Sequence, residues 1–258
     1  MSALAGRHAL VTGGGRGIGA AIATALAAEG ARLTLVGRDR AVLDAHAATL
    51  PAAAAAHAVV ADVADEAAVA AAFDAARSRH GDVAILVNNA GIAASRPFAK
   101  LDLATWNAML AVNLTSAFLC SRAVVPAMVA AGTGRIVNVA SSAGLVGGKY
   151  IAAYCASKHG MIGLTRSLAV ELAAKGVTVN AVCPGFTESE MLDRSLASIA
   201  SNTGRSESEA AAALLAHNPL GRFVRAEEVA AAVTWLCRPE AAAITGQAIA
   251  IDGGEVQH

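Results

Sequence analysis

The feature that most constrains the fold is a regular alternation, along the whole chain, of short β-branched runs with longer alanine-rich segments. The short runs predict strands at His8–Thr12, Arg32–Val36, Ala58–Val60, Ala84–Asn88, Arg135–Ala140, Val177–Val182 and Ala248–Ile251. The segments between them predict helices, among them Ile18–Glu29, Glu66–Arg79, Trp106–Ala131, Tyr154–Ala174 and Ala226–Leu236. Such alternation predicts βαβ units, and therefore an α/β fold in which helices cover both faces of one doubly wound parallel sheet.

The composition is that of a globular protein with a large apolar core. Of the 258 residues, 55% are hydrophobic and 16% are charged, and 20 Lys and Arg balance 20 Asp and Glu. A chain without net charge has no field to attract a polyanion, so we expect neither a nucleic-acid partner nor a membrane partner. Because no change in composition marks a boundary, we predict a single domain over residues 1–258.

Two segments depart from the regular pattern. Leu103–Ser121 is uncharged and nearly long enough to span a membrane, but its Asn, Thr and Ser side chains indicate a buried helix. Glu188–Arg222 is rich in Ser, Glu, Ala and Arg and is too long for an ordinary connection, which predicts a helical lid.

The cysteines are dispersed and have no nearby histidine pair at metal-ligand spacing. We therefore expect small buried hydrophobes in a reducing, cytoplasmic compartment, and no metal site, from Cys120, Cys155, Cys183 and Cys237.

A glycine-rich segment joins the first predicted strand to the first predicted helix. It supplies as candidate cofactor-binding residues Gly13, Gly15, Arg16, Gly17, Ile18 and Gly19. Glycines at such a junction let backbone N–H groups and the helix dipole approach a pyrophosphate. The spacing reads either as Gly-x-x-x-Gly-x-Gly or as Gly-x-Gly-x-x-Ala, and both suit a dinucleotide in a Rossmann-type fold. A Walker loop is excluded because no Gly-Lys-Ser/Thr follows.

The end of the second strand bears on which dinucleotide is bound. In NAD sites an acid commonly binds the adenosine ribose here, but this strand runs into Gly37-Arg38-Asp39. Gly37 leaves space for a phosphate, and Arg38, aided by Arg16, can pair with it. These residues favour NADP(H) over NAD(H). In the alternative, Arg38 is a solvated surface cation and Asp39 is the ribose ligand or a helix cap.

Tyr154 and Lys158 stand at i and i+4, so both project from one face of a predicted helix. An ammonium about 4 Å from a phenol would lower the phenol pKa by about 3 units, enough for proton exchange with a carbonyl oxygen near neutral pH. Ser141 follows a strand, where open α/β sheets bind ligands, and its hydroxyl could orient that oxygen.

The glycine segment, Asn88-Asn89-Ala90-Gly91, Ser141, Tyr154-x-x-x-Lys158 and Pro184-Gly185 occur in an order and spacing that resembles the short-chain dehydrogenase/reductase family, over about Leu4–Gly254. The resemblance implies that Tyr154 is the general acid/base, that Lys158 binds the nicotinamide ribose and lowers the tyrosine pKa, and that Ser141 binds the substrate oxygen. It further implies that Asn113 bends the long helix and holds a water of a proton relay. The remaining implied cofactor contacts are Asp62, Val63, Asn89, Ala90, Gly91, Pro184, Gly185 and Thr187.

Several of these assignments keep an alternative. In the alternative, Asn113 does no more than satisfy a buried backbone group, and Asp62 does no more than cap a helix. Ser142 competes with Ser141, although the family's spacing favours Ser141. Ser189 competes with Thr187 for the nicotinamide carboxamide. Tyr150, the other tyrosine, is assigned to the substrate mouth.

The resemblance implies a ketone/secondary-alcohol oxidoreductase, with a 3-oxoacyl or 3-hydroxyacyl thioester as the favoured substrate. The small apolar loop 144–148 leaves room for an acyl chain, and the lid supplies apolar side chains at Met191, Leu192, Leu196 and Ile199. Cations that could meet a substrate phosphate or carboxylate are Arg96, Lys149, Arg194 and Arg205. Alternatives are a small aromatic, alicyclic or sugar alcohol, or, more remotely, a non-catalytic cofactor-binding sensor or scaffold. The resemblance also implies a homotetramer.

Overall fold

A computed structural model describes residues 2–216 and 218–256. The predicted domain 1–258 and the predicted lid 188–222 each include positions outside these residues. The strands are β1 (His8–Thr12), β2 (Arg32–Gly37), β3 (His57–Val60), β4 (Ile85–Asn88), β5 (Gly134–Val139), β6 (Val177–Pro184) and β7 (Ala248–Ile251). The α-helices are α1 (Gly17–Ala28), α2 (Arg40–Thr49), α3 (Glu66–His80), α4 (Leu103–Leu110), α5 (Ser116–Ala130), α6 (Ala152–Leu172), α7 (Glu190–Thr203), α8 (Glu207–Leu215) and α9 (Ala226–Cys237).

These strands form one seven-stranded sheet in the order β3-β2-β1-β4-β5-β6-β7, and every pairing is parallel. This confirms the predicted doubly wound Rossmann-type fold. The strand order reverses between β1 and β4, and folds of this type bind ligands beyond the carboxyl ends of the strands at that point.

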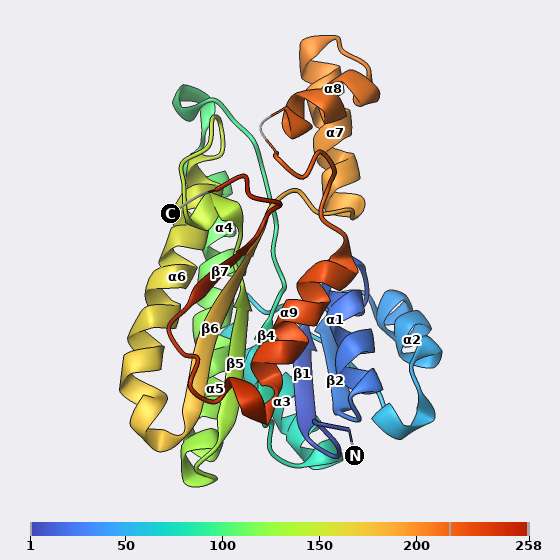
Figure 1. Ribbon diagram of the computed structural model, residues 1–258, viewed down its shortest axis with the longest axis vertical. Coiled ribbons are helices and arrows are strands. Elements are labelled where there is room, and N and C mark those ends of the chain that lie inside the picture. Colours follow the sequence, from blue (N-terminus) through green and yellow to red (C-terminus); the bar gives the residue numbers. More distant parts are fainter. Residues whose placement is uncertain (1, 217, 257–258) are drawn as a thin grey trace.

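Two apolar cores cover the two faces of the sheet. Along β1, Ala9 and Val11 belong to one core and Leu10 to the other, because successive side chains of a strand point to opposite faces. The first core contains apolar residues of α1 and α9, and the second contains residues of α3, α5 and α6. Figure 1 shows α1, α2 and α9 gathered on one side, with α7 and α8 standing beyond the sheet.

The single long helix predicted over Trp106–Ala131 is divided in the structure. It begins at Leu103, where the Asp102 carboxylate accepts a hydrogen bond from the backbone N–H of Thr105 at 2.7 Å. A π-helical turn, Ala111–Thr115, then separates α4 from α5. The run Leu103–Ala130 is long and apolar enough to cross a membrane, with mean hydropathy 1.6, but α5 contributes Leu119 and other residues to the core against the sheet.

A buried histidine lies at the opposite end of the sheet from the switch point. The His8 imidazole is 2.8 Å from the Gly81 carbonyl oxygen through Nδ1 and 2.9 Å from the Thr34 hydroxyl through Nε2, and its ring contacts His80 edge-on. Burial is the main cause that lowers the pKa of His8 to about 4, from 6.5.

We expect this histidine to make stability depend on pH. Between pH 6.5 and about 4 the folded protein binds fewer protons at His8 than the unfolded chain does, so the free energy of unfolding falls as the pH drops. The expected loss is roughly 3 kcal/mol. Urea unfolding of the wild type and His8→Gln across this range measures it. If the difference between the two proteins stayed constant with pH, His8 would not be the cause.

Candidate active site

The register of the sheet brings the candidate residues to one edge. Thr12 of β1 is paired with Val36 of β2, and Asn88 of β4 with Asn138 of β5. In a parallel sheet the segments that follow these residues emerge on the same side. The carboxyl ends of the strands therefore carry the four candidate segments along one side of the sheet. These are the glycine loop, the residues after Gly37, the Asn89 segment and Ser141.

The glycine loop fits a cofactor phosphate. Gly13 has φ +66, and a Cβ on Gly19 would lie 2.1 Å from the Gly13 carbonyl oxygen, so neither position admits a side chain without rearrangement. Arg16, at the N-cap of α1, makes no side-chain capping bond, and the first turn contains no acid. In the part of the chain that the structure describes, no side chain accepts from the N–H groups at this helix end, which suits a dinucleotide phosphate.

Polar contacts tie the glycine loop to the Asn89 segment across the switch point. The Thr12 hydroxyl accepts hydrogen bonds from the backbone N–H groups of Asn89 and Ala90, each at 3.0 Å. The Asn89 amide donates to the Thr12 carbonyl oxygen at 2.9 Å. The two predicted cofactor segments therefore form one connected wall.

Arg38 is exposed beyond the end of β2. Among the described residues it forms neither an ion pair nor a hydrogen bond, so its guanidinium is available to a ligand. Asp39 instead accepts a hydrogen bond from the Val42 N–H at 3.2 Å and caps α2, which was the second of its two alternatives. Asp62 accepts from the Ala64 N–H at 2.9 Å, while Asp65 is the residue that caps α3.

Tyr154 and Lys158 both lie on α6, and Ser141 precedes a short 3₁₀ turn, Ser142–Gly144. The Lys158 ammonium lies 5.7 Å from the centre of the Tyr154 ring and donates to the Val139 carbonyl oxygen at 2.8 Å. A Cβ on Gly91 would lie 3.8 Å from the same ammonium nitrogen, so the Asn89 segment approaches Lys158 as well.

The electrostatics differ from the prediction that Lys158 brings the tyrosine pKa near neutrality. Desolvation raises the pKa of Tyr154, and hydrogen bonding with Ser141 acts in the opposite direction but does not cancel it. Burial lowers the pKa of Lys158 to about 8. The predicted effect assumed an ammonium about 4 Å from the phenol, whereas this ammonium points to a backbone carbonyl. In this structure burial therefore favours the neutral phenol and keeps the Tyr154 pKa above its ordinary value.

Asn113 lies in the π-helical turn and is fully buried. Its amide donates to the Ile92 carbonyl oxygen at 2.9 Å and to the Ser157 hydroxyl at 3.0 Å, and its oxygen accepts from the Ile92 N–H at 2.8 Å. It thus bonds both backbone polar groups of Ile92, and in doing so joins the segment after Gly91 to the helix that carries Lys158.

The sequence analysis did not identify a buried polar ladder behind this site. Asn88 donates to Asn138 at 2.8 Å, and Asn138 donates to the Thr165 hydroxyl at 2.8 Å. The ladder connects β4, β5 and α6, and so fixes α6 against the sheet. The available signal was Asn138 itself, a polar residue inside the apolar strand β5.

Three comparisons with known proteins agree with this geometry. The sequence model described as short chain dehydrogenase matches residues 7–199. A granaticin polyketide synthase putative ketoacyl reductase of Streptomyces violaceoruber is 44% identical over 95% of this chain and 92% of its own length. A 2-(S)-hydroxypropyl-CoM dehydrogenase of Xanthobacter autotrophicus is 42% identical over 95% and 94%. A crystal structure of an actinorhodin polyketide ketoreductase variant with NADPH superposes with TM-score 0.94 at 39% identity, covering 98% of both chains.

The chain belongs to the short-chain dehydrogenase family. As a short-chain dehydrogenase it is an oxidoreductase that transfers a hydride between a ketone or secondary alcohol and a nicotinamide cofactor.

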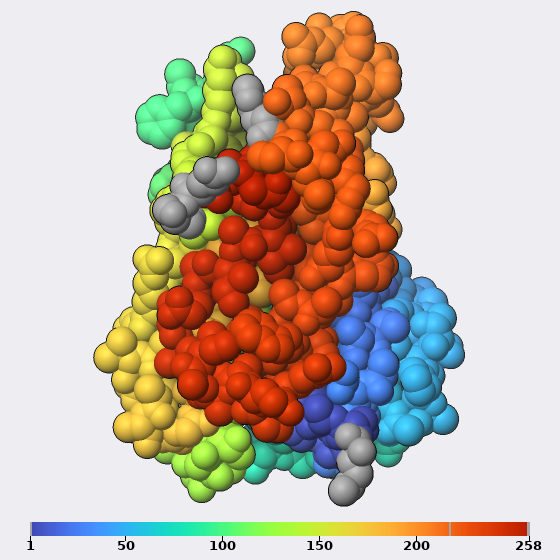
Figure 2. Space-filling model, viewed as in Figure 1, coloured from blue at the N-terminus to red at the C-terminus, as the bar shows by residue number. Residues whose placement is uncertain are grey.

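The segment predicted as a lid forms a helical hairpin, α7 and α8. Ser189 caps α7, since its hydroxyl accepts from the Leu192 N–H at 3.4 Å and donates to the Thr187 carbonyl oxygen at 3.0 Å. Thr187 is buried and pairs with Val224, which joins the two ends of the lid. Figure 2 shows the lid (orange) standing apart from the green loops at the upper end of the molecule.

A second group of residues gathers around Tyr150. The Tyr150 carbonyl oxygen accepts from the Arg96 N–H at 2.8 Å, and the Lys149 ammonium lies 5.0 Å from the centre of the Tyr150 ring. Tyr150 has φ +68, a strained conformation for a non-glycine residue. Two of the four candidate substrate cations, Arg96 and Lys149, are thus brought together here, and Arg194 and Arg205 lie on the lid hairpin.

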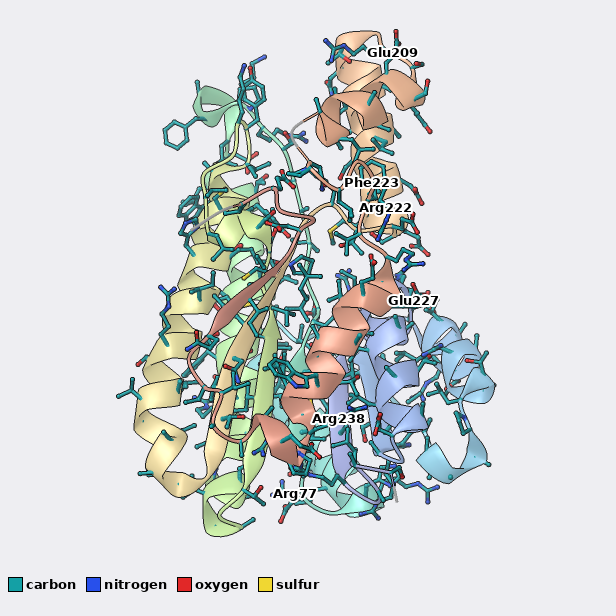
Figure 3. All side chains as sticks on the ribbon, viewed as in Figure 1. Arg77, Glu209, Arg222, Phe223, Glu227 and Arg238 are labelled. Atoms are coloured by element: carbon teal, nitrogen blue, oxygen red, sulfur yellow. The ribbon has the colours of Figure 1, made fainter. Side chains whose placement is uncertain are left out.

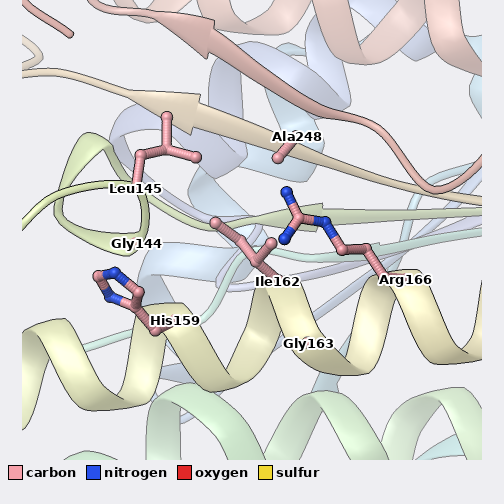
Figure 4. Close-up of a pocket in the computed structure, with 7 residues that line it drawn as sticks. All are labelled: Gly144, Leu145, His159, Ile162, Gly163, Arg166 and Ala248. Atoms are coloured by element: carbon pink, nitrogen blue, oxygen red, sulfur yellow. The ribbon is translucent and has the colours of Figure 1, made fainter. Parts of the chain in front are cut away.

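A cavity of about 380 Å³ lies beside α6, away from the glycine loop. Figure 4 shows it between α6, β7 and the turn after Ser141, with His159 and Arg166 among the side chains that line it. Among the described residues, no group of three or more His, Cys, Asp or Glu could hold a metal ion. Cys120, Cys183 and Cys237 are buried, but Cys155 is partly exposed, contrary to the prediction for that residue.

Proposed function

We propose that this enzyme is an NADP(H)-dependent reductase of 3-oxoacyl thioesters. The observation that carries the reaction is the convergence of Ser141, Tyr154 and Lys158 beside the glycine loop, at the edge where the strand order reverses. The acyl substrate is supported by the likeness to a ketoacyl reductase and to a polyketide ketoreductase. The cofactor is supported by the guanidinium of Arg38, which has no partner among the described residues, and by the NADPH in that structure.

Each side chain then has a defined task. NADPH, when bound, supplies the hydride that adds to the carbonyl carbon. Tyr154 donates its phenolic proton to the carbonyl oxygen, and the Ser141 hydroxyl donates a hydrogen bond to the same oxygen. A raised phenol pKa suits this direction, because it keeps the donor protonated at neutral pH. Lys158 binds the cofactor ribose and, as a cation, favours the phenolate that proton transfer leaves.

Asn113 and Thr187 complete the proposed site. Asn113 holds the Gly91 segment against α6 and, at the π-helical turn, keeps a place for a relay water. Thr187 binds the nicotinamide carboxamide, a choice supported by Ser189 being used as the cap of α7. Asp62 and Val63 contact the adenine. The enzyme is proposed to act in the cytoplasm.

A substrate panel tests the proposal. NADPH and NADH oxidation would be measured with acetoacetyl-CoA, a small cyclic ketone, a keto sugar and 2-ketopropyl-CoM, the last because the 2-(S)-hydroxypropyl-CoM relative and the cations Arg96 and Lys149 favour a small anionic substrate as the second candidate. We expect the highest kcat/KM with acetoacetyl-CoA and NADPH. A higher value for 2-ketopropyl-CoM would favour the second candidate, and no turnover with any ketone would contradict both.

We expect the lid to bind the apolar part of the acyl group. Leu196 and Ile199 are only partly buried on α7, as is Met191, whereas Leu192 is buried. Changing Leu196 and Ile199 together to serine should raise KM for a long 3-oxoacyl thioester at least about tenfold, since each buried apolar side chain contributes about 1.5–3 kcal/mol. KM for a small ketone and the Kd for NADPH should change less than about twofold. Equal losses for small and long substrates would contradict this role.

A homotetramer is also proposed. Leu103, Phe118 and Val170 expose large apolar side chains on α4, α5 and α6, and β7 is an edge strand with one unpaired side. Covering both surfaces requires two contacts per chain, which gives four copies. Light scattering at micromolar concentration should give a mass near four chains, and a stable monomer would contradict the proposal.

A further inference from the structure

The two ends of the lid hairpin are held by different ion pairs. At the end that returns to α9, Arg222 forms a two-pronged pair with Glu228, at 2.7 and 2.9 Å. Figure 3 shows Arg222 between the lid and α9. At the other end, Glu190 in the first turn of α7 accepts from the guanidinium of Arg16 at 2.9 Å. Only this second pair uses a residue of the glycine loop.

The Arg16 guanidinium therefore has two competing partners. It is the second cation proposed for the cofactor 2′-phosphate, and in this structure it is bound by the Glu190 carboxylate of the lid. The lid and the loop approach each other closely here, since a Cβ on Gly17 would lie 3.6 Å from the Cβ of Ser189. A phosphate that takes Arg16 must separate the guanidinium from Glu190 or accept the carboxylate as a close negative neighbour.

We infer that Glu190 is a specificity-determining residue, which lowers the affinity for the 2′-phosphate by holding Arg16 and so couples the choice of cofactor to the lid. This inference rests on the proposed role of Arg16 in cofactor binding. NADH lacks the 2′-phosphate and leaves the Arg16–Glu190 pair intact. NADPH draws Arg16 away and releases the first turn of α7. Arg38, free among the described residues, then carries the basal preference for NADPH.

The neighbouring charges single out Glu190. Asp193 lies in the same first turn of α7 but has no ion pair with Arg16 among the described residues. The guanidinium of Arg194 lies 3.7 Å from the Glu190 carboxylate, so this carboxylate keeps a cationic partner when Arg16 leaves. Both members of the Arg16–Glu190 pair are more than half exposed, at 55% and 57%, which limits the expected effect to a few-fold change in affinity.

The test is cofactor binding, measured without substrate. The Kd values of NADPH and NADH would be obtained from the change in cofactor fluorescence for wild type, Glu190→Gln and the matched control Asp193→Asn. We expect Glu190→Gln to tighten NADPH about twofold to fivefold and to leave NADH within experimental error. Asp193→Asn should change neither. Adenosine 2′,5′-bisphosphate should follow NADPH, and 1 M NaCl should abolish the gain.

A double variant separates this coupling from a general charge effect. If Glu190 acts through Arg16, the gain from Glu190→Gln disappears in an Arg16→Gln background. Equal tightening of both cofactors, a persistent gain without Arg16, or no change would overturn the inference. This outcome is distinguishable from a failure of the proposed NADPH preference. A wild type that prefers NADH could still bind NADPH more tightly in Glu190→Gln, and a wild type that prefers NADPH could show no such gain.

Discussion

Tyr154→Phe is expected to lose at least about a hundredfold in kcat and to keep its fold and its affinity for NADPH. The change removes a single oxygen, the proposed proton donor to the carbonyl, and leaves the ring that packs beside Lys158. General acids typically contribute a factor of about 10² to 10⁴ to the rate. The measurement is steady-state kinetics together with NADPH fluorescence titration.

The same substitution at the other tyrosine provides the control. Tyr150→Phe removes an equivalent hydroxyl outside α6, at the expected substrate mouth, so any effect should fall on KM and kcat should stay within about threefold of wild type. If Tyr154→Phe kept more than about a tenth of the wild-type kcat, Tyr154 would not be the acid. Similar losses at both positions would point to a general effect of the substitutions on folding.

Arg38→Asp is expected to shift the NADPH-to-NADH ratio of kcat/KM by about a hundredfold toward NADH. Within residues 2–216 and 218–256, Arg38 is an unpaired cation beyond β2, and a charge-assisted hydrogen bond to phosphate is worth about 1.5–3 kcal/mol. The introduced carboxylate adds repulsion of the 2′-phosphate and can bind a ribose hydroxyl of NADH. Kinetics with both cofactors at fixed ketone concentration measure the ratio.

Arg40→Asp tests whether position or only net charge matters. Arg40 begins α2, where a carboxylate is favourable, and its guanidinium already donates to the Ala58 carbonyl oxygen at 2.8 Å. This variant has the same charge change and should shift the ratio less than about threefold. An equal shift for both variants would mean that the preference reflects the field of the surface, and an unmodified enzyme with equal use of both cofactors would contradict the assignment.

The sheet was predictable because its signals are local. β1 and β7 begin and end where β-branched runs flanked by glycine and turn residues place them, and the glycine loop follows β1 directly. The helix expected over Trp106–Ala131 was less accurate, because the π-helical turn at Asn113 is stabilised by contacts with Ile92 and Ser157. Those partners are distant in sequence, so no periodicity within the helix predicts them.

The sequence predicts which residues form the candidate site more readily than it predicts their pKa values. Tyr154 and Lys158 share a helical face, which the sequence spacing shows. Whether the Lys158 ammonium faces the phenol of Tyr154 depends on Val139 of β5, whose carbonyl oxygen accepts a hydrogen bond from that ammonium. The ladder from Asn88 to Thr165 and the pair between Arg16 and Glu190 likewise join elements that only the folded chain brings together.

Transfer of a deuterium label tests the central claim most directly. Wild-type enzyme would be incubated with acetoacetyl-CoA and, separately, with each of the two NADPH diastereomers deuterated at nicotinamide C4. We predict that one diastereomer places deuterium on C3 of the 3-hydroxybutyryl product and that the other gives unlabelled product, with mass spectrometry as the readout. A product without deuterium from both diastereomers, or no reduction of the 3-oxo group while NADPH binds, would contradict the claim.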